Sequence, residues 1–172
     1  MDAKEIVVAS LKQSRAYLDR ALDGLSQEDI AWRPSDECNC IAFIAWHTAR
    51  VEDFFISRVI QRQGQIYETQ GWQDKLGTPA DSGFGYSVEQ LKEWPVPKLA
   101  DLVGYVDAVR ANTSSLLDEL TPEKMLELAR PDRPPDTIGA VLSRIITETA
   151  LHMGQIDYIR GIHLGFVTTH GV

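Results

Sequence analysis

Three ionisable side chains interrupt apolar helical stripes in the sequence: His47, Glu148 and His152. Glu148 and His152 are four residues apart, so on a helix they share one face, with Cβ atoms about 5–6 Å apart. His47 belongs to a separate stripe, where it stands between Ile44 and Val51 at steps of three and four. If the two helices pack together, this spacing predicts that the three side chains point inward and meet in the core.

A bound divalent cation would explain three such groups in one core. A buried carboxylate without a partner is strongly unfavourable. Imidazole nitrogen and carboxylate oxygen are good ligands for zinc, nickel or iron(II), and two His with one carboxylate leave positions open for water or substrate. The alternative is a buried ion pair between Glu148 and His152, with His47 hydrogen-bonded to backbone or water. Spacing alone leaves both interpretations open.

The elements that must position these residues are four long helices. Apolar residues recur at helical spacing in four segments, and no segment alternates with the period of two that a strand requires. The segments are approximately residues 2–22, 41–63, 97–120 and 136–161. Amphipathic helices of this length pack as a bundle. We therefore predict an all-α four-helix bundle with a long connection between its second and third helices.

Local signals mark several of the helix ends. Asp2, with Glu5 three residues later, has the pattern of a capping box, and either Asp136 or Thr137 can serve as the N-cap of the last helix. Gly161 is expected to end that helix. The connection of residues 64–96 is rich in aromatic residues, so we expect it to fold over one end of the bundle, with a short helix capped by Ser87.

Composition narrows the protein class. The 172 residues are expected to form one domain, 1–172, with 44% hydrophobic residues and a net charge of −8. Such a surface repels nucleic acid, and no apolar run has the length of a membrane span. Cys38 and Cys40 are too close in sequence to form a disulfide framework. A cytoplasmic protein is expected.

Two blocks of sequence resemble the DinB-like superfamily of helical bundle proteins. The first is the run Trp32-Arg33-Pro34, followed by Asn39 and residues 41–50 (IAFIAWHTAR). The second, more specific block comprises residues 138–142 (IGAVL) and residues 148–157 (ETALHMGQID). The similarity covers nearly the whole chain in the same order.

The resemblance implies a metal site and a reaction class. Members typically bind a divalent metal through one His on the second helix and a His-x-x-x-His pair on the fourth. His47 matches the first ligand and His152 the last, whereas Glu148 replaces the remaining His. A carboxylate can still coordinate metal, so the resemblance implies a zinc, nickel or iron enzyme. It implies a transferase that uses a small-molecule thiol, or a related hydrolase, and we expect a homodimer.

Two other classes of function remain open from the sequence. The bundle could bind metal or a ligand without catalysis, in a stress response, or it could be a structural dimer whose core polar residues only pair. Among other polar residues, Cys40 is interpreted as a small buried hydrophobe. For Gln155 and Asp157 the sequence leaves two roles open: one of them could orient a metal ligand, or they could face solvent or a dimer partner. His163 and His170 lie past Gly161 and are expected in the tail.

Overall fold

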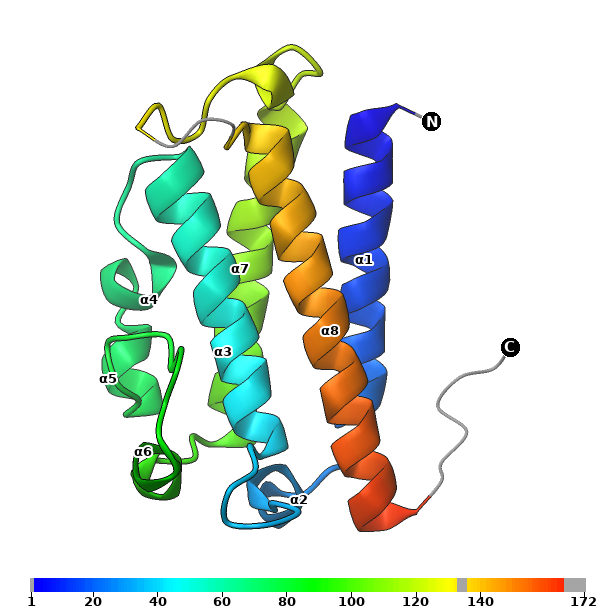
Figure 1. Ribbon diagram of the computed structural model, residues 1–172, viewed down its shortest axis with the longest axis vertical. Helices are drawn as coiled ribbons and strands as arrows, with labels where there is room; N and C mark the ends of the chain where they lie inside the picture. Colours follow the sequence, from blue (N-terminus) through cyan, green and yellow to red (C-terminus); the bar gives the residue numbers. More distant parts are fainter. Residues whose placement is uncertain (1, 133–135, 166–172) are drawn as a thin grey trace.

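The structure is a computed structural model that describes residues 2–132 and 136–165. Its framework consists of four long helices (Figure 1): α1 (Ala3–Leu22), α3 (Ile41–Asp53), α7 (Leu99–Glu119) and α8 (Ile138–Leu164). No strand forms within these residues, where β-type pairing is limited to an isolated bridge between Leu128 and Thr137. The predicted all-α bundle is confirmed.

The order of the helices explains the long connection. Helix α8 packs against both α1 and α3, and α3 also packs against α7. In Figure 1, α1 and α8 run downward, whereas α3 and α7 both run upward. Because α3 and α7 are parallel, the chain between them must return along the bundle, as in bundles with a crossover connection. The expected long connection between the second and third long helices is confirmed.

The capping signals at two helix starts act as predicted. At the start of α1, the Glu5 backbone amide donates to the Asp2 carboxylate at 2.8 Å, and the Asp2 amide donates to the Glu5 carboxylate at 2.8 Å. At the start of α8, the Thr137 hydroxyl accepts from the Ala140 amide at 3.2 Å. These side chains satisfy amides that have no partner within their helix.

The end of α8 differs from the expectation. The helix continues through Gly161 to Leu164 and is followed by Gly165 with φ of +83°. His163 therefore belongs to the helix, and its prediction as a tail residue was wrong. His170 lies outside the described residues.

Tertiary contacts account for the last turn of α8. The His163 ring stacks on Trp32 with ring centroids 4.4 Å apart. Its Nε2 atom lies 2.9 Å from the carboxylate of Asp29, which belongs to the short helix α2 (Gln27–Ala31). These long-range contacts stabilise a helical turn that a glycine would otherwise tend to end.

The second predicted helix changes character halfway along its length. After α3, residues Phe54–Ile60 form the π-helical segment η1, where the Gln61 amide donates to the Ile56 carbonyl at 2.9 Å. The prediction of one uninterrupted α-helix through residue 63 therefore missed this segment. π-Helical turns widen the backbone spiral and occur frequently at functional sites.

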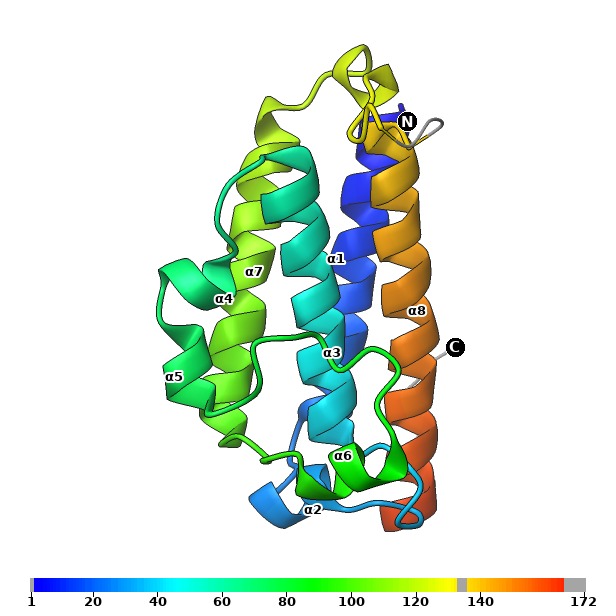
Figure 2. The same ribbon diagram turned by 60° about the vertical axis from the view of Figure 1, so that its left-hand side comes forward.

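The connection contains three short helices, α4 (Ile66–Thr69), α5 (Trp72–Leu76) and α6 (Val88–Glu93), and the 3-10 turn η2 (Lys124–Leu126) follows α7. As predicted, Ser87 caps α6. Figure 2 shows the loop between α5 and α6 crossing the outside of α3 toward α8. The connection thus covers a flank of the bundle, whereas the sequence suggested an end.

The apolar core consists of two clusters separated by a polar layer. On α3 the first cluster ends at Ala49 and the second begins, on η1, at Ile56. Between these levels the long helices bury the polar residues Ser14, Arg50, Glu52, Asp53, Thr113 and Thr149. No described helix has the length and apolar character needed to cross a bilayer. The polar layer lies next to the candidate site described below.

Candidate functional site

A cavity of about 480 Å³ opens on the flank of the bundle. It is bounded by α3, η1, α8 and the loop of residues 80–84. Its lining residues are His47, Arg50, Val51, Phe54, Phe55, Gln65, Ala80, Asp81, Ser82, Phe84, Arg144 and Glu148. Two of the three candidate ligands, one from α3 and one from α8, therefore border the same space.

The three predicted site residues are neighbours across the interface of α3 and α8. The rings of His47 and His152 meet edge to face, with centroids 5.0 Å apart. The Nε2 atom of His152 lies 3.6 Å from a carboxylate oxygen of Glu148, one helical turn earlier. These side chains are less deeply buried than the sequence analysis predicted. Glu148 is 41% exposed and His152 18% exposed, so the cluster lies beside the cavity rather than inside the core.

His47 is held by the loop that covers it. Its Nδ1 atom is hydrogen-bonded to the carbonyl oxygen of Ser82, which can only accept, so Nδ1 carries the proton. Burial lowers the pKa of His47 most strongly; the Ser82 contact and Glu148 raise it, and His152 lowers it further. The lowered pKa favours the neutral ring, whose Nε2 atom then carries a free lone pair.

The Nδ1 atom of His152, like that of His47, has a hydrogen-bond partner. This atom lies 2.8 Å from the side-chain oxygen of Gln155, a contact that can orient the ring. Nδ1 contacts of this kind fix the tautomer and expose Nε2, as is usual for histidines that coordinate metal. Asp157, the other residue that the sequence analysis considered beside His152, is half-buried on the same helix.

The donor set suits a divalent ion. Two imidazole Nε2 atoms and one carboxylate are the groups that zinc, nickel and iron(II) prefer. In residues 2–132 and 136–165, however, no three His, Cys, Asp or Glu side chains are gathered closely enough to hold an ion. The three side chains therefore suit such an ion by the chemistry of their donor atoms, but they do not form a coordination sphere in this arrangement.

A buried arginine anchors the loop that carries Ser82. Arg50 is 3% exposed, and its guanidinium donates to the carbonyls of Ala80 at 2.7 Å and Asp81 at 3.1 Å. The guanidinium also donates to Gln65 at 3.1 Å and lies 3.8 Å from the ring centre of Tyr67. Because it bonds the two carbonyls before Ser82, Arg50 holds the loop against α3.

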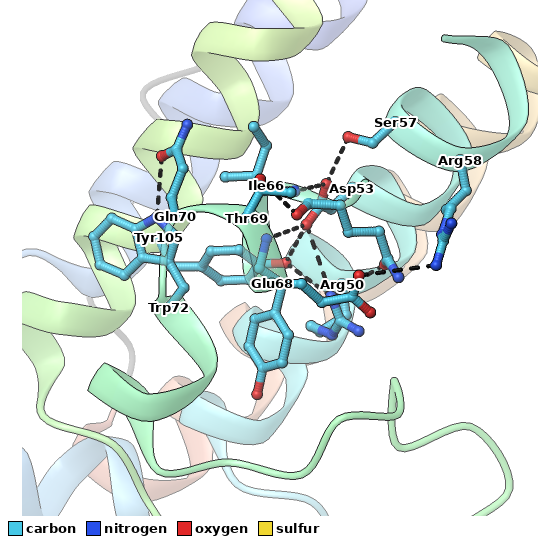
Figure 3. Close-up of polar contacts among 12 residues, drawn as sticks. Arg50, Asp53, Ser57, Arg58, Ile66, Glu68, Thr69, Gln70, Trp72 and Tyr105 are labelled. Atoms are coloured by element: carbon cyan, nitrogen blue, oxygen red, sulfur yellow. Dashed lines mark hydrogen bonds and ion pairs between the residues drawn. The ribbon is translucent and has the colours of Figure 1, made fainter. Parts of the chain in front are cut away.

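Asp53 completes this network (Figure 3). Its carboxylate lies 3.7 Å from the Arg50 guanidinium and accepts bonds from the Tyr105 hydroxyl at 3.0 Å and the Ser57 hydroxyl at 2.8 Å. It also accepts from the backbone amides of Ile66 and Tyr67. One buried carboxylate thus joins α3, α7, η1 and the start of the connection.

The sequence analysis missed this network, although a signal was present. Trp46, Arg50, Asp53 and Ser57 follow one another at steps of four, three and four, which defines a second inward stripe on α3 and η1. A helix with two inward stripes must be covered on two sides. No comparable sequence pattern indicated that Ser82 and Phe84 would lie at the cavity, because their positions depend on the path of a loop.

Cys40 plays the structural role expected of it. Its side chain is fully buried, and its sulfur accepts from the Phe43 amide at 3.4 Å, which caps α3. Burial raises the pKa of its thiol above the ordinary value. A buried thiol with a raised pKa is a poor nucleophile, so Cys40 lacks the features of a reactive cysteine.

Comparison with known proteins agrees with this architecture. A crystal structure of a conserved protein from Enterococcus faecalis shares the fold with a TM-score of 0.85 and 21% identity, over 96% of this chain and 99% of that one. No curated protein matches the chain significantly. The family model for mycothiol S-transferase matches residues 6–165. The chain therefore belongs to the mycothiol-S-transferase family, which is one of the DinB-like families.

Proposed function

We propose that this protein is a divalent-metal-dependent enzyme that transfers a low-molecular-weight thiol to a small electrophile. The observation that carries the proposal is the pairing of His47 and His152, whose Nδ1 atoms are both engaged, beside Glu148 at a cavity large enough for a small molecule. The family supports transfer of a thiol. The metal and its ligands are part of the proposal.

The three side chains would hold the ion through Nε2 of His47, Nε2 of His152 and the Glu148 carboxylate. Zinc, nickel or iron in such a site lowers the pKa of a bound thiol or water, so that a nucleophile is available near pH 7. The Ser82 carbonyl and the Gln155 side chain keep the two rings in the tautomer that coordination requires.

The transfer is balanced without an oxidant or a reductant. The thiolate sulfur forms a bond to the electrophilic carbon, and the bond from that carbon to its leaving atom breaks with the electron pair on the leaving atom. With an epoxide, the leaving atom is the ring oxygen, which takes up the proton that the thiol released. Water in place of the thiol would give the related hydrolysis.

The test combines metal content with activity. The protein is purified without immobilised-metal resin, and its metal content is measured together with conjugation of mycothiol, glutathione or cysteine to styrene oxide. We expect about one metal ion per chain. We also expect chelation or His152→Ala to lower the rate about a hundredfold or more, because metal catalysis contributes several kcal/mol.

His163→Ala is the matched control, because this histidine is on the same helix but contacts Asp29 and Trp32 instead of the cavity. It should retain metal and activity. Metal binding without turnover of any thiol or of water would favour the non-catalytic interpretation. Equal activity in His152→Ala and the native chain would contradict the proposed site.

A further inference from the structure

Phe84 is a large apolar side chain left in water beside the candidate site. It is 88% exposed, yet it lines the cavity that also contains His47 and Glu148. An exposed ring forgoes the hydrophobic stabilisation that burial would provide. Exposure of a single apolar side chain is common, but Phe84 also borders a cavity. A ligand bound in that cavity could therefore cover part of the ring.

The local backbone conformation directs the Phe84 ring away from the bundle. Both neighbours of Phe84 are glycines in the left-handed region. Gly83 has φ of +72° and Gly85 has φ of +73°. At Gly83, an added Cβ would lie 2.7 Å from the ring of Phe43 and 2.8 Å from the ring of Trp46. Only glycine permits so close an approach, so the loop lies directly on α3 while residue 84 projects outward.

The base of the loop is fixed on both sides of Phe84. The Asp81 carboxylate accepts from the Gly83 amide at 2.7 Å and from the Tyr86 hydroxyl at 2.6 Å. His47 holds the Ser82 carbonyl, as described above. Because the backbone on either side of the ring is already held, contact with a ligand does not require the loop itself to be ordered.

Three further lining residues of the cavity are apolar. Val51, Phe54 and Phe55 line it from α3 and η1. The histidine and carboxylate of the candidate site also border this space. The cavity thus combines an apolar compartment with a group of ionisable residues, which is the usual construction of a small-molecule site.

We infer that Phe84 determines substrate specificity by packing on the apolar body of the electrophile. The electrophile would carry an aromatic or bulky aliphatic group next to its reactive carbon, held between Phe84 and the wall formed by Val51, Phe54 and Phe55. This inference rests on the proposed function for its catalytic part. The binding of an apolar ligand does not depend on turnover and can be measured separately.

The kinetic test compares two epoxides with the same reactive ring. Styrene oxide carries a phenyl group, and 1,2-epoxypropane carries a methyl group. In Phe84→Ala we expect kcat/KM for styrene oxide to fall about tenfold, while the value for 1,2-epoxypropane changes less than about twofold. Tyr158→Ala is the matched control, since this exposed aromatic side chain, 72% exposed, does not line the cavity.

The binding test uses unreactive diols of the same two shapes. Titration of 1-phenylethane-1,2-diol and propane-1,2-diol, followed by NMR, should show that only the phenyl compound binds appreciably and that its Kd rises about tenfold in Phe84→Ala. If no thiol is transferred but this binding depends on Phe84, the proposed reaction fails, and Phe84 is still shown to select apolar ligands. If the phenyl diol does not bind, or if Phe84→Ala behaves like the native chain in either test, the inference is wrong.

Discussion

The Nδ1 atom of His47 is hydrogen-bonded to the carbonyl oxygen of Ser82, 35 residues later in the chain. This bond connects the candidate site to the loop that covers it. Because the carbonyl can only accept, the bond also decides which ring nitrogen carries the proton. The chemistry available to His47 therefore depends on the position of the loop, and the loop depends on Arg50.

Metal removal should destabilise the native protein and leave a ligand variant unaffected. A ligand that binds only the folded state stabilises it by about 2.7 kcal/mol at a hundred times its Kd. We expect chelation to lower the Tm of the metal-loaded native protein and to leave the Tm of Glu148→Ala almost unchanged, as measured by calorimetry. Equal shifts in the two proteins would indicate an effect unrelated to this site.

Loss of the Arg50 side chain should be among the most destabilising single changes. Arg50→Met removes the donors to Ala80 and Asp81 and leaves the Asp53 carboxylate buried without its cation. Breaking a buried pair in this way costs about 3–5 kcal/mol. The free energy of unfolding in urea measures this loss, and limited proteolysis should show earlier cleavage within residues 78–86.

Arg58→Met provides the comparison for Arg50. Arg58 is half exposed and lies 3.9 Å from Glu68, an arrangement that contributes about 0–1 kcal/mol. If both variants lost the same stability, the network around Asp53 would not have the structural importance assigned to it.

The contacts of Asp29 should make the stability of the protein depend on acid pH. Hydrogen bonds from the Ser26 side chain and backbone, followed by that of His163, lower the pKa of Asp29 from 3.8 to about 2. A lowered carboxylate pKa contributes stability that is present above the ordinary pKa and is lost as the pH falls toward about 2. An NMR titration of the Asp29 carboxyl carbon should show this midpoint.

The Ser26→Ala variant tests the cause of that shift. It removes the largest contribution, so it should raise the midpoint of Asp29 more than His163→Gln does. The opposite order would mean that the contact between α2 and α8, rather than the cap of α2, controls this carboxylate.

The two cysteines should differ sharply in reactivity. Cys40 is fully buried with a raised pKa, whereas Cys38 is half-buried. We expect iodoacetamide at pH 8 to modify Cys38 alone in the folded protein and both residues in urea, as read by mass spectrometry. Modification of Cys40 at the rate of Cys38 under native conditions would contradict the burial of the α3 cap.

Local sequence patterns were sufficient to predict those features that residues close together in the chain determine. The caps at Asp2 and Ser87 were predicted correctly, and that of α8 to within one residue, because an N-cap satisfies amides only two or three residues away. The four-helix architecture followed from apolar spacing for the same reason. The proximity of Glu148 and His152 followed from the pitch of a single helix.

The sequence alone gave a wrong prediction, or none, where contacts with distant segments override the local helical preference. Gly161 has the composition of a helix end, but the contacts of His163 with Trp32 and Asp29 carry α8 one turn further. The π-helical segment η1 had no signal, because widening of the helix depends on what packs around it.

For the site itself, the sequence determined which ionisable residues could be neighbours, and the tertiary structure decided their surroundings. Spacing predicted that His47 would meet the pair on the last helix, and the structure places the His47 ring edge to face with that of His152. The path of the connection decided how deeply these side chains are buried, which tautomer His47 adopts and which residues cover the site. That path places Ser82 and Phe84 beside the cavity. That path is set by long-range bonds to Arg50 and Asp53, and contacts between distant segments leave no periodic pattern in the sequence.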